Sequence, residues 1–264
     1  MDTVKNDEIL QAVRERYAQV AESSDAGCSC GPTCCDTADV SAEALSQELG
    51  YTADEVGAVP QGANMGLGCG NPQAIAALKA GEMVLDLGSG GGFDCFLAAR
   101  QVGDAGRVIG VDMTPEMISK ARANAEKGDY RNVEFRLGEI ENLPIANESI
   151  DVIISNCVIN LSPNKPRVFS EAYRVLKSGG RLAISDIVAF AEIPEAVRRD
   201  ISLFTGCMAG ASLVSEVEAM LEESGFRQIR VSPKEESKAF IRDWAPGTDI
   251  TEYVVSASIE AVKP

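Results

Sequence analysis

Hydrophobic and polar positions alternate along the middle of the chain in short apolar runs separated by helical periods. Five runs predict buried strands, at residues 83–87, 107–111, 133–137, 150–155 and 181–187. The intervening segments predict helices at 93–102, 115–127 and 166–176, the last ending at Gly179–Gly180. Strands and helices in this order are typical of a mainly parallel sheet with helices on both faces, an α/β fold.

Both ends of the chain add elements to this core. Upstream we expect a helix at 4–22, a helix from Ser41 to Leu49, and a glycine-rich loop at 57–72 leading into a helix at 72–80. Downstream we expect helices at 195–210 and 214–224, a strand at 226–232 and a final edge strand at 251–262. The sequence therefore predicts an N-terminal helical, cysteine-bearing segment (1–59), a core (60–190) and a C-terminal segment (191–264) that completes the sheet and the substrate site.

Charge and composition narrow the partners of the protein. The 264 residues carry a formal net charge of −16, which repels phosphate-rich partners, so we expect a small-molecule ligand and no nucleic acid. No stretch approaches the roughly 20 apolar residues of a membrane span, and the charged N-terminus does not resemble a signal peptide. We therefore expect no membrane partner and a cytoplasmic location, where the eight cysteines would mostly be thiols.

A glycine-rich turn follows the first predicted strand of the core. Asp86 begins the motif DLGSGGGF, and Asp112 ends the next predicted strand about twenty residues later. Glycines let the backbone approach a ligand beside the positive end of a helix, and the second acidic residue can accept ribose hydroxyls. Dinucleotide binding is the competing interpretation, but G-S-G-G-G-F does not match G-x-G-x-x-G, and Asp86 suits a cationic ligand. Both aspartates could alternatively cap the helices that follow them.

The DLGSGGG form resembles the first motif of the class I (seven-stranded, Rossmann-like) methyltransferases, which use S-adenosyl-L-methionine. The segment GEIENLPIANESIDVI at 138–153 resembles their later motifs. The resemblance implies that Asp112 holds the ribose, that Glu139 and Ile140 contact adenine, and that the strand ending at Ser155 faces the transferred methyl. It makes 60–190 the cofactor-binding core, with these expected cofactor residues: Asp86, Gly88, Ser89, Gly90, Asp112, Met113, Glu139, Ile140 and Asn156.

Three cysteines stand in glycine or asparagine contexts, while the chain contains no histidine. They are Cys69 in GLGCGNP, Cys157 in SNCVIN and Cys207 in TGCMAGA. Without an imidazole base, an acceptor that has no proton to lose is favoured over an oxygen nucleophile. The segment Ser155–Val158 also lacks the aromatic clamp of many amino-methylating enzymes. Thiols without imidazole therefore indicate a soft, thiophilic substrate.

Together these segments, the paired Cys34–Cys35 and the stretch 142–152 resemble the arsenite S-adenosylmethionine methyltransferases, over residues 5 to 262. The resemblance implies that Cys157 and Cys207 hold trivalent arsenic and that Cys69 is the third ligand and the redox partner. A fourth catalytic cysteine would come from Cys28, Cys30, Cys34 or Cys35, and we favour Cys34. The implied partners are arsenite, methylated arsenicals and a thiol reductant of the glutathione or thioredoxin type.

Several alternatives stay open at this stage. Cys95 reads as a small buried hydrophobe on an apolar helix, and Cys157 could also be one because it follows a buried strand. The cysteines at 28–35 could bind zinc, although C-x-C and C-C are not the usual knuckle spacings. The protein could instead methylate a small organic acceptor such as a quinone or lipid ring. It could also be a thiol-rich metalloid-binding protein whose cofactor fold is vestigial.

Overall fold

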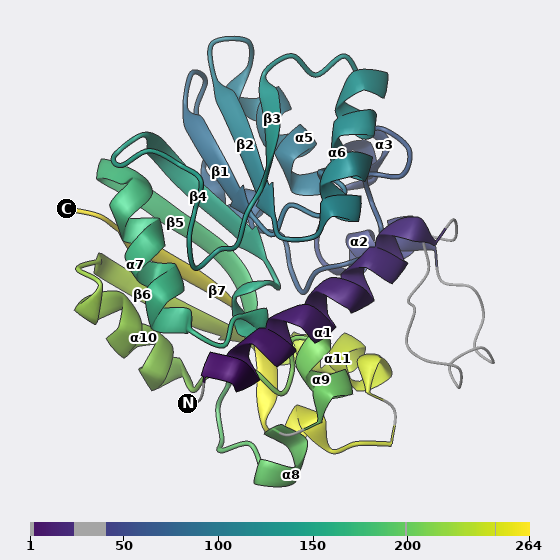
Figure 1. The fold of residues 1–264 in the computed structure, drawn as a ribbon, viewed down its shortest axis with the longest axis vertical. Helices are drawn as coiled ribbons and strands as arrows, with labels where there is room; N and C mark the ends of the chain where they lie inside the picture. The colour runs from purple at the N-terminus through teal and green to yellow at the C-terminus, as the bar shows by residue number, and fades with distance from the viewer. Residues whose placement is uncertain (1–2, 24–40, 199, 246) are drawn as a thin grey trace.

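The computed structural model describes residues 3–23, 41–198, 200–245 and 247–264. Seven strands form one sheet in the order β3–β2–β1–β4–β5–β7–β6 (Figure 1). Their bounds are β1 Met83–Leu87, β2 Arg107–Asp112, β3 Val133–Leu137, β4 Ile150–Asn156, β5 Leu176–Ala189, β6 Arg227–Lys234 and β7 Val254–Val262. Strands β1 to β5 run parallel, whereas β7 is antiparallel to both of its neighbours.

Helices cover both faces of this sheet (Figure 1). In chain order they are α1 Thr3–Glu22, α2 Ala42–Glu48, α3 Ala53–Gly57, α4 Gln73–Ala76, α5 Phe93–Val102, α6 Pro115–Lys127, α7 Lys165–Val175, α8 Glu195–Arg198, α9 Ile201–Thr205, α10 Val214–Glu223 and α11 Lys238–Trp244. Short 3₁₀ turns occur at Ile159–Leu161, Glu235–Ser237 and Ile250–Glu252. None of the described helices is both long enough and apolar enough to cross a bilayer.

Alternation along the central strands builds two hydrophobic cores, one on each face of the sheet. In β1, Leu85 packs into the core that contains Phe169 of α7 and Leu221 of α10. Its neighbour Val84 packs into the opposite core with Phe96 of α5. Successive strand residues point to opposite faces, so a strand covered on both sides is apolar throughout. This arrangement fixes the carboxyl ends of β1, β2 and β4 side by side, where a site can form.

Most predicted elements of the core are confirmed. The bounds expected for the segments at 83–87, 93–102, 115–127 and 133–137 are those of β1, α5, α6 and β3. The helix after Ser41 is also present, and the Ser41 side chain accepts a hydrogen bond from the backbone N–H of Ala44. Strands from both sides of residue 190 belong to the same sheet, since β5 pairs with β7. The expected division into segments 1–59, 60–190 and 191–264 stays a prediction.

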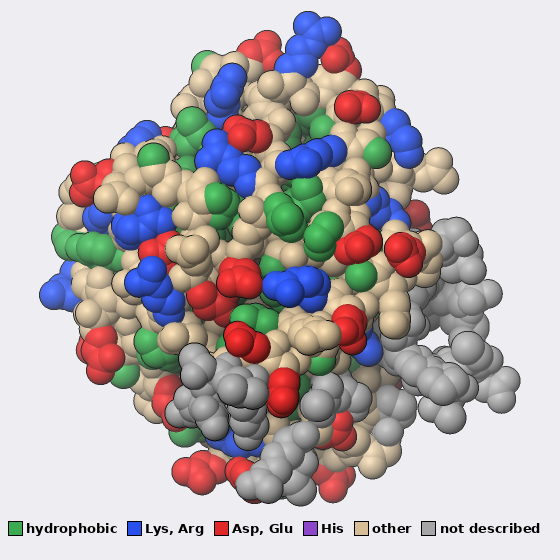
Figure 2. Space-filling model, viewed as in Figure 1, with side chains coloured by type: hydrophobic (Ala, Val, Ile, Leu, Met, Phe, Trp, Pro, Cys, Tyr) green, Lys and Arg blue, Asp and Glu red, His purple; other side chains and the backbone are tan. Residues whose placement is uncertain are grey.

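On the face shown in Figure 2, acidic and basic side chains are interspersed.

Two predictions about the sheet were wrong. The strand at 251–262 was expected at the edge, but β7 lies between β5 and β6, and β6 is the edge strand. Gly179–Gly180 was expected to end a helix, yet both glycines belong to β5, and α7 ends at Val175. The last turn of α7 needs no glycine cap, because the Lys263 ammonium donates to the carbonyls of Tyr173 and Leu176.

Two helical predictions also need correction, and two helices were missed. The helix expected at 72–80 shrinks to α4, because the Arg181 guanidinium binds the carbonyls of Ala76 and Ala77 and the chain turns there. The single helix expected at 195–210 is instead the two short helices α8 and α9. A new helix begins because the Asp200 carboxylate accepts the backbone N–H of Leu203. Helices α3 and α11 were not predicted.

Glu171 ties the loop before β4 to α7, and this contact generates a prediction. Its buried carboxylate accepts the backbone N–H of Leu143 at 2.9 Å and pairs with Arg174 at 2.7 Å. The hydrogen bond from Arg174 leads the effects that lower the pKa of Glu171 below 4.5. We expect Glu171→Gln to reduce the free energy of unfolding by about 1–3 kcal/mol near neutral pH.

The pH dependence gives this prediction its sign. A carboxyl whose pKa is lowered by folding stabilises the protein above its ordinary pKa, and that contribution is lost as the pH falls through the folded-state value. The difference between wild type and Glu171→Gln, measured by urea unfolding, should therefore narrow in acid. Glu134→Gln, which breaks an exposed pair with Arg136, is the matched control, expected to cost under about 1 kcal/mol. A pH-independent difference for Glu171→Gln would contradict this account.

Candidate active site

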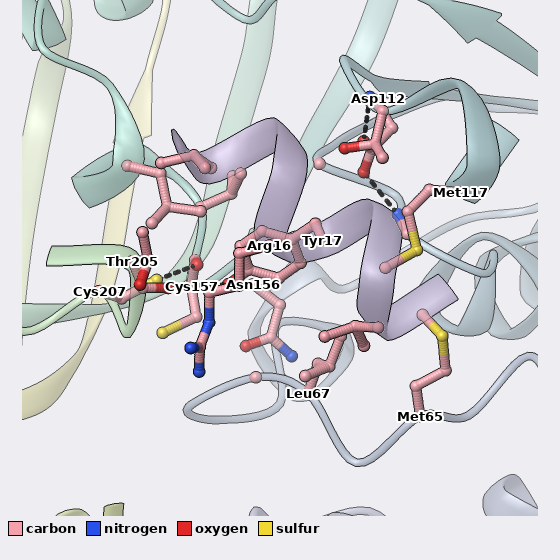
Figure 3. A pocket seen from close by; sticks show the side chains of 18 of the residues that line it. Arg16, Tyr17, Met65, Leu67, Asp112, Met117, Asn156, Cys157, Thr205 and Cys207 are labelled. Carbon is pink, nitrogen blue, oxygen red and sulfur yellow. Dashed lines mark hydrogen bonds between the residues drawn. The ribbon is translucent and has the colours of Figure 1, made fainter. Parts of the chain in front are cut away.

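A cavity of about 590 Å³ lies at the carboxyl ends of β1, β2 and β4, beneath α1. Figure 3 shows Asp112 and Met117 at one end of this pocket, Cys157 and Cys207 at the other, and Tyr17 of α1 between them. Residues lining the cavity come from α1, the loop 62–68, the turn after β1 and the segments that follow β2, β4 and α9. The cavity therefore has two chemically different ends joined by one space.

The turn after β1 can be made only with glycine at key positions. Gly88, Gly90 and Gly92 all have positive φ values, of 68°, 50° and 95°. A Cβ on Gly88 would lie 2.4 Å from a methyl carbon of Val158, and one on Gly92 would lie 2.7 Å from the Phe96 ring. The Ser89 hydroxyl oxygen is buried and has no hydrogen-bond partner among the described residues. The turn is thus a tight cradle with a polar atom that a ligand can engage.

Asp112 stands at the end of β2 and supports this cradle. One carboxylate oxygen accepts the backbone N–H of Gly90 at 3.0 Å, and the other accepts that of Thr114 at 2.9 Å. The N-cap residue of α6 is Thr114, and no described side chain caps this helix, so Asp112 does not take the capping role considered from the sequence. Asp112 also lines the cavity, and burial raises its pKa. A carboxylate has further lone pairs, so these two backbone contacts leave it able to bind a ligand.

Two buried carboxyl groups lie at the floor of this end. Burial and the nearby charge of Asp94 raise the pKa of Asp86 well above its ordinary value. The Tyr51 hydroxyl donates to Asp94 at 2.8 Å, and the Cys95 thiol donates to Asp86 at 3.2 Å. A cationic ligand would stabilise the ionised form of such carboxyls, so this end of the cavity favours positive charge. The sequence reading missed Asp94 and Tyr51, although Asp94 directly follows the glycine motif.

Asn156 lines the cavity, but its amide is already bonded within the protein. The side-chain oxygen accepts the backbone N–H of Cys69 at 2.9 Å, and the amide nitrogen donates to the Gly70 carbonyl at 2.8 Å and the Tyr51 hydroxyl at 3.0 Å. Asn156 therefore fixes the loop that carries Cys69 against the end of β4. Its expected role in cofactor binding stays a prediction.

Three cysteines distant in sequence meet at the other end of the cavity. The sulfurs of Cys69 and Cys157 and a carboxylate oxygen of Asp186 all lie within 4.8 Å of one another. The Cys207 thiol donates to the Cys157 carbonyl at 2.7 Å (Figure 3). Cys69 and Cys207 are buried and Cys157 is half-buried; Cys157 and Cys207 line the cavity, and Cys69 lies directly behind Cys157. Their expected role as substrate ligands stays a prediction, and the structure brings all three together.

The backbone at two of these cysteines is strained. Cys157 has φ of 58° and Cys207 has φ of 66°, in the left-handed region that costs non-glycine residues energy. Such strain persists where surrounding contacts impose it, and here the Cys157 N–H donates to the Ser185 carbonyl at 2.8 Å. The pKa of the Cys69 thiol is raised by burial, and that of Cys207 by its contact with Cys157 and then by burial. Both shifts favour the protonated thiol over the thiolate at Cys69 and Cys207.

Helix α1 covers both ends of the cavity. Tyr17 donates to the Thr205 carbonyl at 3.4 Å near the cysteines, and Lys120 of α6 donates to the Ala21 carbonyl at the far end. Arg14 pairs with Glu139 at 3.1 Å. Glu139 thus bonds to α1, whereas Met113 and Ile140 line the cavity. The periodicity of residues 4–22 predicted a helix, but it did not indicate that the buried face of this helix covers the cavity. The cysteines for which a catalytic or zinc-binding role was expected upstream, Cys28, Cys30, Cys34 and Cys35, lie outside the described residues.

The order of the sheet, the antiparallel β7, the glycine turn after β1 and the acidic residue after β2 define a class I S-adenosylmethionine-dependent methyltransferase. A family model for the methyltransferase domain matches residues 78–225. The arsenite methyltransferase of Halobacterium salinarum is 56% identical over 98% of this chain and 67% of its own length. The chain belongs to the arsenite methyltransferase family, as its motifs indicated.

Two further relatives support this assignment. The arsenite methyltransferase of Aquipseudomonas alcaligenes is 41% identical over 84% of this chain and 63% of its own length. The crystal structure of an arsenic(III) S-adenosylmethionine methyltransferase from Chlamydomonas reinhardtii superposes with a TM-score of 0.62 at 36% identity, covering 83% of this chain and 73% of that one. This chain thus spans about two thirds of the length of the two curated relatives. The predicted fold class and family are confirmed.

The contacts of Asn156 generate a prediction about Cys69. Asn156→Ala removes the hydrogen bonds that hold residues 69 and 70, so the loop should open more often and expose the Cys69 thiol. We expect faster alkylation of Cys69 by iodoacetamide, followed by peptide mass spectrometry, and a loss of about 1–3 kcal/mol in unfolding free energy. Asn132→Ala, which removes two bonds to backbone carbonyls of the α5 end, is the control. Equal Cys69 alkylation in both variants would refute the assigned role.

Proposed function

We propose that the chain transfers methyl groups from S-adenosylmethionine to trivalent arsenic held by Cys69, Cys157 and Cys207. The products are methylated arsenicals and S-adenosylhomocysteine. The observation that carries this proposal is the meeting of three thiols, two of which line one end of a cavity whose other end is a glycine cradle with buried acids. Membership of the arsenite methyltransferase family supports it, and the arsenic-related activity of the relatives is here extended to this chain.

The acidic end of the cavity suits S-adenosylmethionine. The backbone turn at 88–90 and the free Ser89 hydroxyl border the space for it, and Asp112 offers lone pairs to ribose hydroxyls. Ile140 and Met113 supply apolar contacts beside them. The pKa values of Asp86 and Asp94 are raised by burial, and a ligand that carries positive charge would stabilise their ionised forms, so this end of the cavity favours a cation. When bound, S-adenosylmethionine supplies an electrophilic methyl group on a sulfonium.

The thiol end suits trivalent arsenic. Arsenous acid exchanges its three hydroxyl groups for three thiolates, and each thiol proton leaves with a hydroxyl as water. The product has three sulfur–arsenic bonds and a lone pair that remains on arsenic. This acceptor has no proton to lose, so a chain without histidine needs no general base for methyl transfer. The cysteine segments hold the acceptor in the cavity that the donor also enters, and this positioning is the main catalytic contribution.

We propose that the cycle ends with a reduction. Methyl transfer takes arsenic formally from the trivalent to the pentavalent state, so two electrons are needed to restore it. Cys69 and one upstream cysteine, for which we favour Cys34, supply them by forming a disulfide. A glutathione- or thioredoxin-type reductant then restores the two thiols, which suits a cytoplasmic location. The burial of Cys69 beside Cys157 supports its part in this scheme.

The direct test of the function is product analysis. The chain is incubated with arsenite, a thiol and methyl-labelled S-adenosylmethionine, and arsenic species are separated and counted. We expect labelled methylated arsenicals, and a loss of rate of roughly a hundredfold or more in Cys157→Ser and Cys207→Ser, because each removes an arsenic ligand. Asp151→Asn, at the opposite end of the sheet from the cavity, should stay close to wild type. Methylation of an organic acceptor that survives both ligand substitutions would favour the organic-acceptor enzyme.

A second test separates catalysis from simple metalloid binding. Asp112→Asn weakens the acceptor placed at the ribose position, so we expect the affinity for S-adenosylhomocysteine to fall about tenfold, or roughly 1.4 kcal/mol. Arsenite binding, measured in parallel by calorimetry, should change little because Asp112 is at the opposite end of the cavity. If the wild-type chain binds arsenite but no S-adenosylhomocysteine, the vestigial-fold alternative gains support instead.

A further inference from the structure

A carboxylate lies beside two of the three thiols, and the proposed methylation has no task for it. Asp186 is on β5, is 2% exposed, and has a side-chain oxygen within 4.8 Å of the sulfurs of both Cys69 and Cys157. Trivalent arsenic takes thiolates in preference to oxygen ligands, so three cysteines satisfy it without a carboxylate. The position of Asp186 beside the thiols therefore indicates a different ligand, one that binds both sulfur and oxygen.

The protein holds Asp186 in a fixed orientation. Its carboxylate accepts the backbone N–H groups of Ile159 at 2.9 Å and Ile187 at 2.7 Å, and the Asn160 amide at 2.9 Å. The same Asn160 amide also donates to the Ile187 carbonyl at 2.6 Å. A carboxylate buried this deeply and bonded from three sides is pre-organised, as a ligand to a bound ion must be.

We propose that Cys69, Cys157 and Asp186 form a binding site for a thiophilic divalent cation of the zinc and cadmium type. Thiolates and carboxylates both bind such ions, which prefer four tetrahedral ligands. Zinc–sulfur bonds of about 2.3 Å and zinc–oxygen bonds of about 2.1 Å place neighbouring ligand atoms roughly 3.5–3.8 Å apart. The three atoms, now within 4.8 Å of one another, reach that spacing by shifts of about an ångström or less.

The fourth ligand comes from solvent in the cavity, which Cys157 lines, because the Cys207 thiol is bonded to the Cys157 carbonyl. Binding requires both thiols to be deprotonated, and their two protons pass to solvent for each cation bound. Two thiolates and one carboxylate then set three negative charges against the two positive charges of the ion. Because both thiols must lose a proton before they bind, the affinity for the cation should rise with pH.

This site shares two cysteines with the proposed arsenic site, so the two ligands exclude each other. That exclusion rests on the proposed function, whereas cation binding itself does not. Asp186 is the residue that separates the two ligands, because it binds the cation and leaves arsenic to sulfur. A thiophilic divalent cation would thus compete with arsenite for Cys69 and Cys157 and inhibit arsenite binding.

The test uses cadmium as the probe. Because the upstream cysteines can also bind it, the reference protein is the full chain carrying Cys28→Ser, Cys30→Ser, Cys34→Ser and Cys35→Ser. Reduced, metal-free protein is titrated anaerobically with cadmium chloride while the ultraviolet thiolate-to-cadmium band is recorded. We expect one cadmium per chain and two protons released. Cys69→Ser and Cys157→Ser should each lower the affinity at least a hundredfold, and Cys95→Ser should leave it unchanged.

Asp186→Asn in the same background is the discriminating variant. It should bind cadmium at least tenfold more weakly, whereas Asp151→Asn, at the other end of the sheet, should bind it as the reference does. Thermal melts check that each variant folds, and the cadmium-113 resonance of the reference protein reports ligation without any change at Asp186. A resonance typical of mixed sulfur and oxygen ligands supports the site. An all-sulfur resonance, no binding, or equal affinity in Asp186→Asn would overturn it.

Arsenite separates this proposal from the methylation. Arsenite should displace cadmium from the reference protein, with loss of the cadmium band. Cadmium binding in a chain that yields no methylated arsenical would leave this site standing and refute the methylation. If the chain methylates arsenite but its Asp186→Asn variant binds cadmium as the reference protein does, the methylation stands and the cation site is refuted.

Discussion

The side-chain amide of Asn156 connects the two halves of the candidate site. It stands at the end of β4, directly before Cys157, and holds the loop of Cys69 through bonds to residues 69 and 70. The same amide reaches Tyr51, which in turn donates to Asp94 at the cofactor end. A few bonds around one residue therefore set where the methyl donor and the thiols lie relative to each other. Such pre-organisation is what methyl transfer between two bound groups requires.

The thiol end is held from several directions at once. Cys157 and Cys207 keep left-handed backbone conformations. The segment after Cys207 packs closely against the Asn160 carbonyl, and only glycine fits at position 210, because a Cβ there would lie 2.2 Å from that oxygen. The Lys165 ammonium fixes the same segment through the Gly210 carbonyl at 2.7 Å. Helix α1 closes the cavity above. Strain at two cysteines is tolerated because these contacts leave the chain little alternative.

The local pattern of the chain predicted the central elements well. Strand β1 and helix α5 are apolar runs of typical strand and helix length, and the turn between them carries its glycines in a recognisable motif, so sequence alone placed the cofactor end. Strand β7 was misplaced because Ser256 and Ser258 give it the alternating look of an edge strand, although both are buried. Its neighbours in the sheet are set by long-range pairing with β5 and β6, which no short window contains.

The candidate site was predictable only where one segment supplied the chemistry. Cys69, Cys157 and Cys207 were singled out by their glycine and asparagine contexts, yet their meeting depends on how β4, β5 and α9 pack. Asp186 gave no signal, since an aspartate in an apolar strand resembles many others. Tyr51 acts through a fold-wide contact with Asp94, which lies 43 positions away. Residues whose partners are distant in sequence were the ones missed.

X-ray absorption at the arsenic edge tests the central claim most directly. The chain, loaded with one equivalent of arsenite in the presence of S-adenosylhomocysteine, should show arsenic with three sulfur neighbours and no oxygen. Cys69→Ser, Cys157→Ser and Cys207→Ser should each reduce the sulfur count to two. Arsenic that keeps oxygen neighbours in the wild-type chain, or three sulfurs that persist in all three variants, would contradict the account.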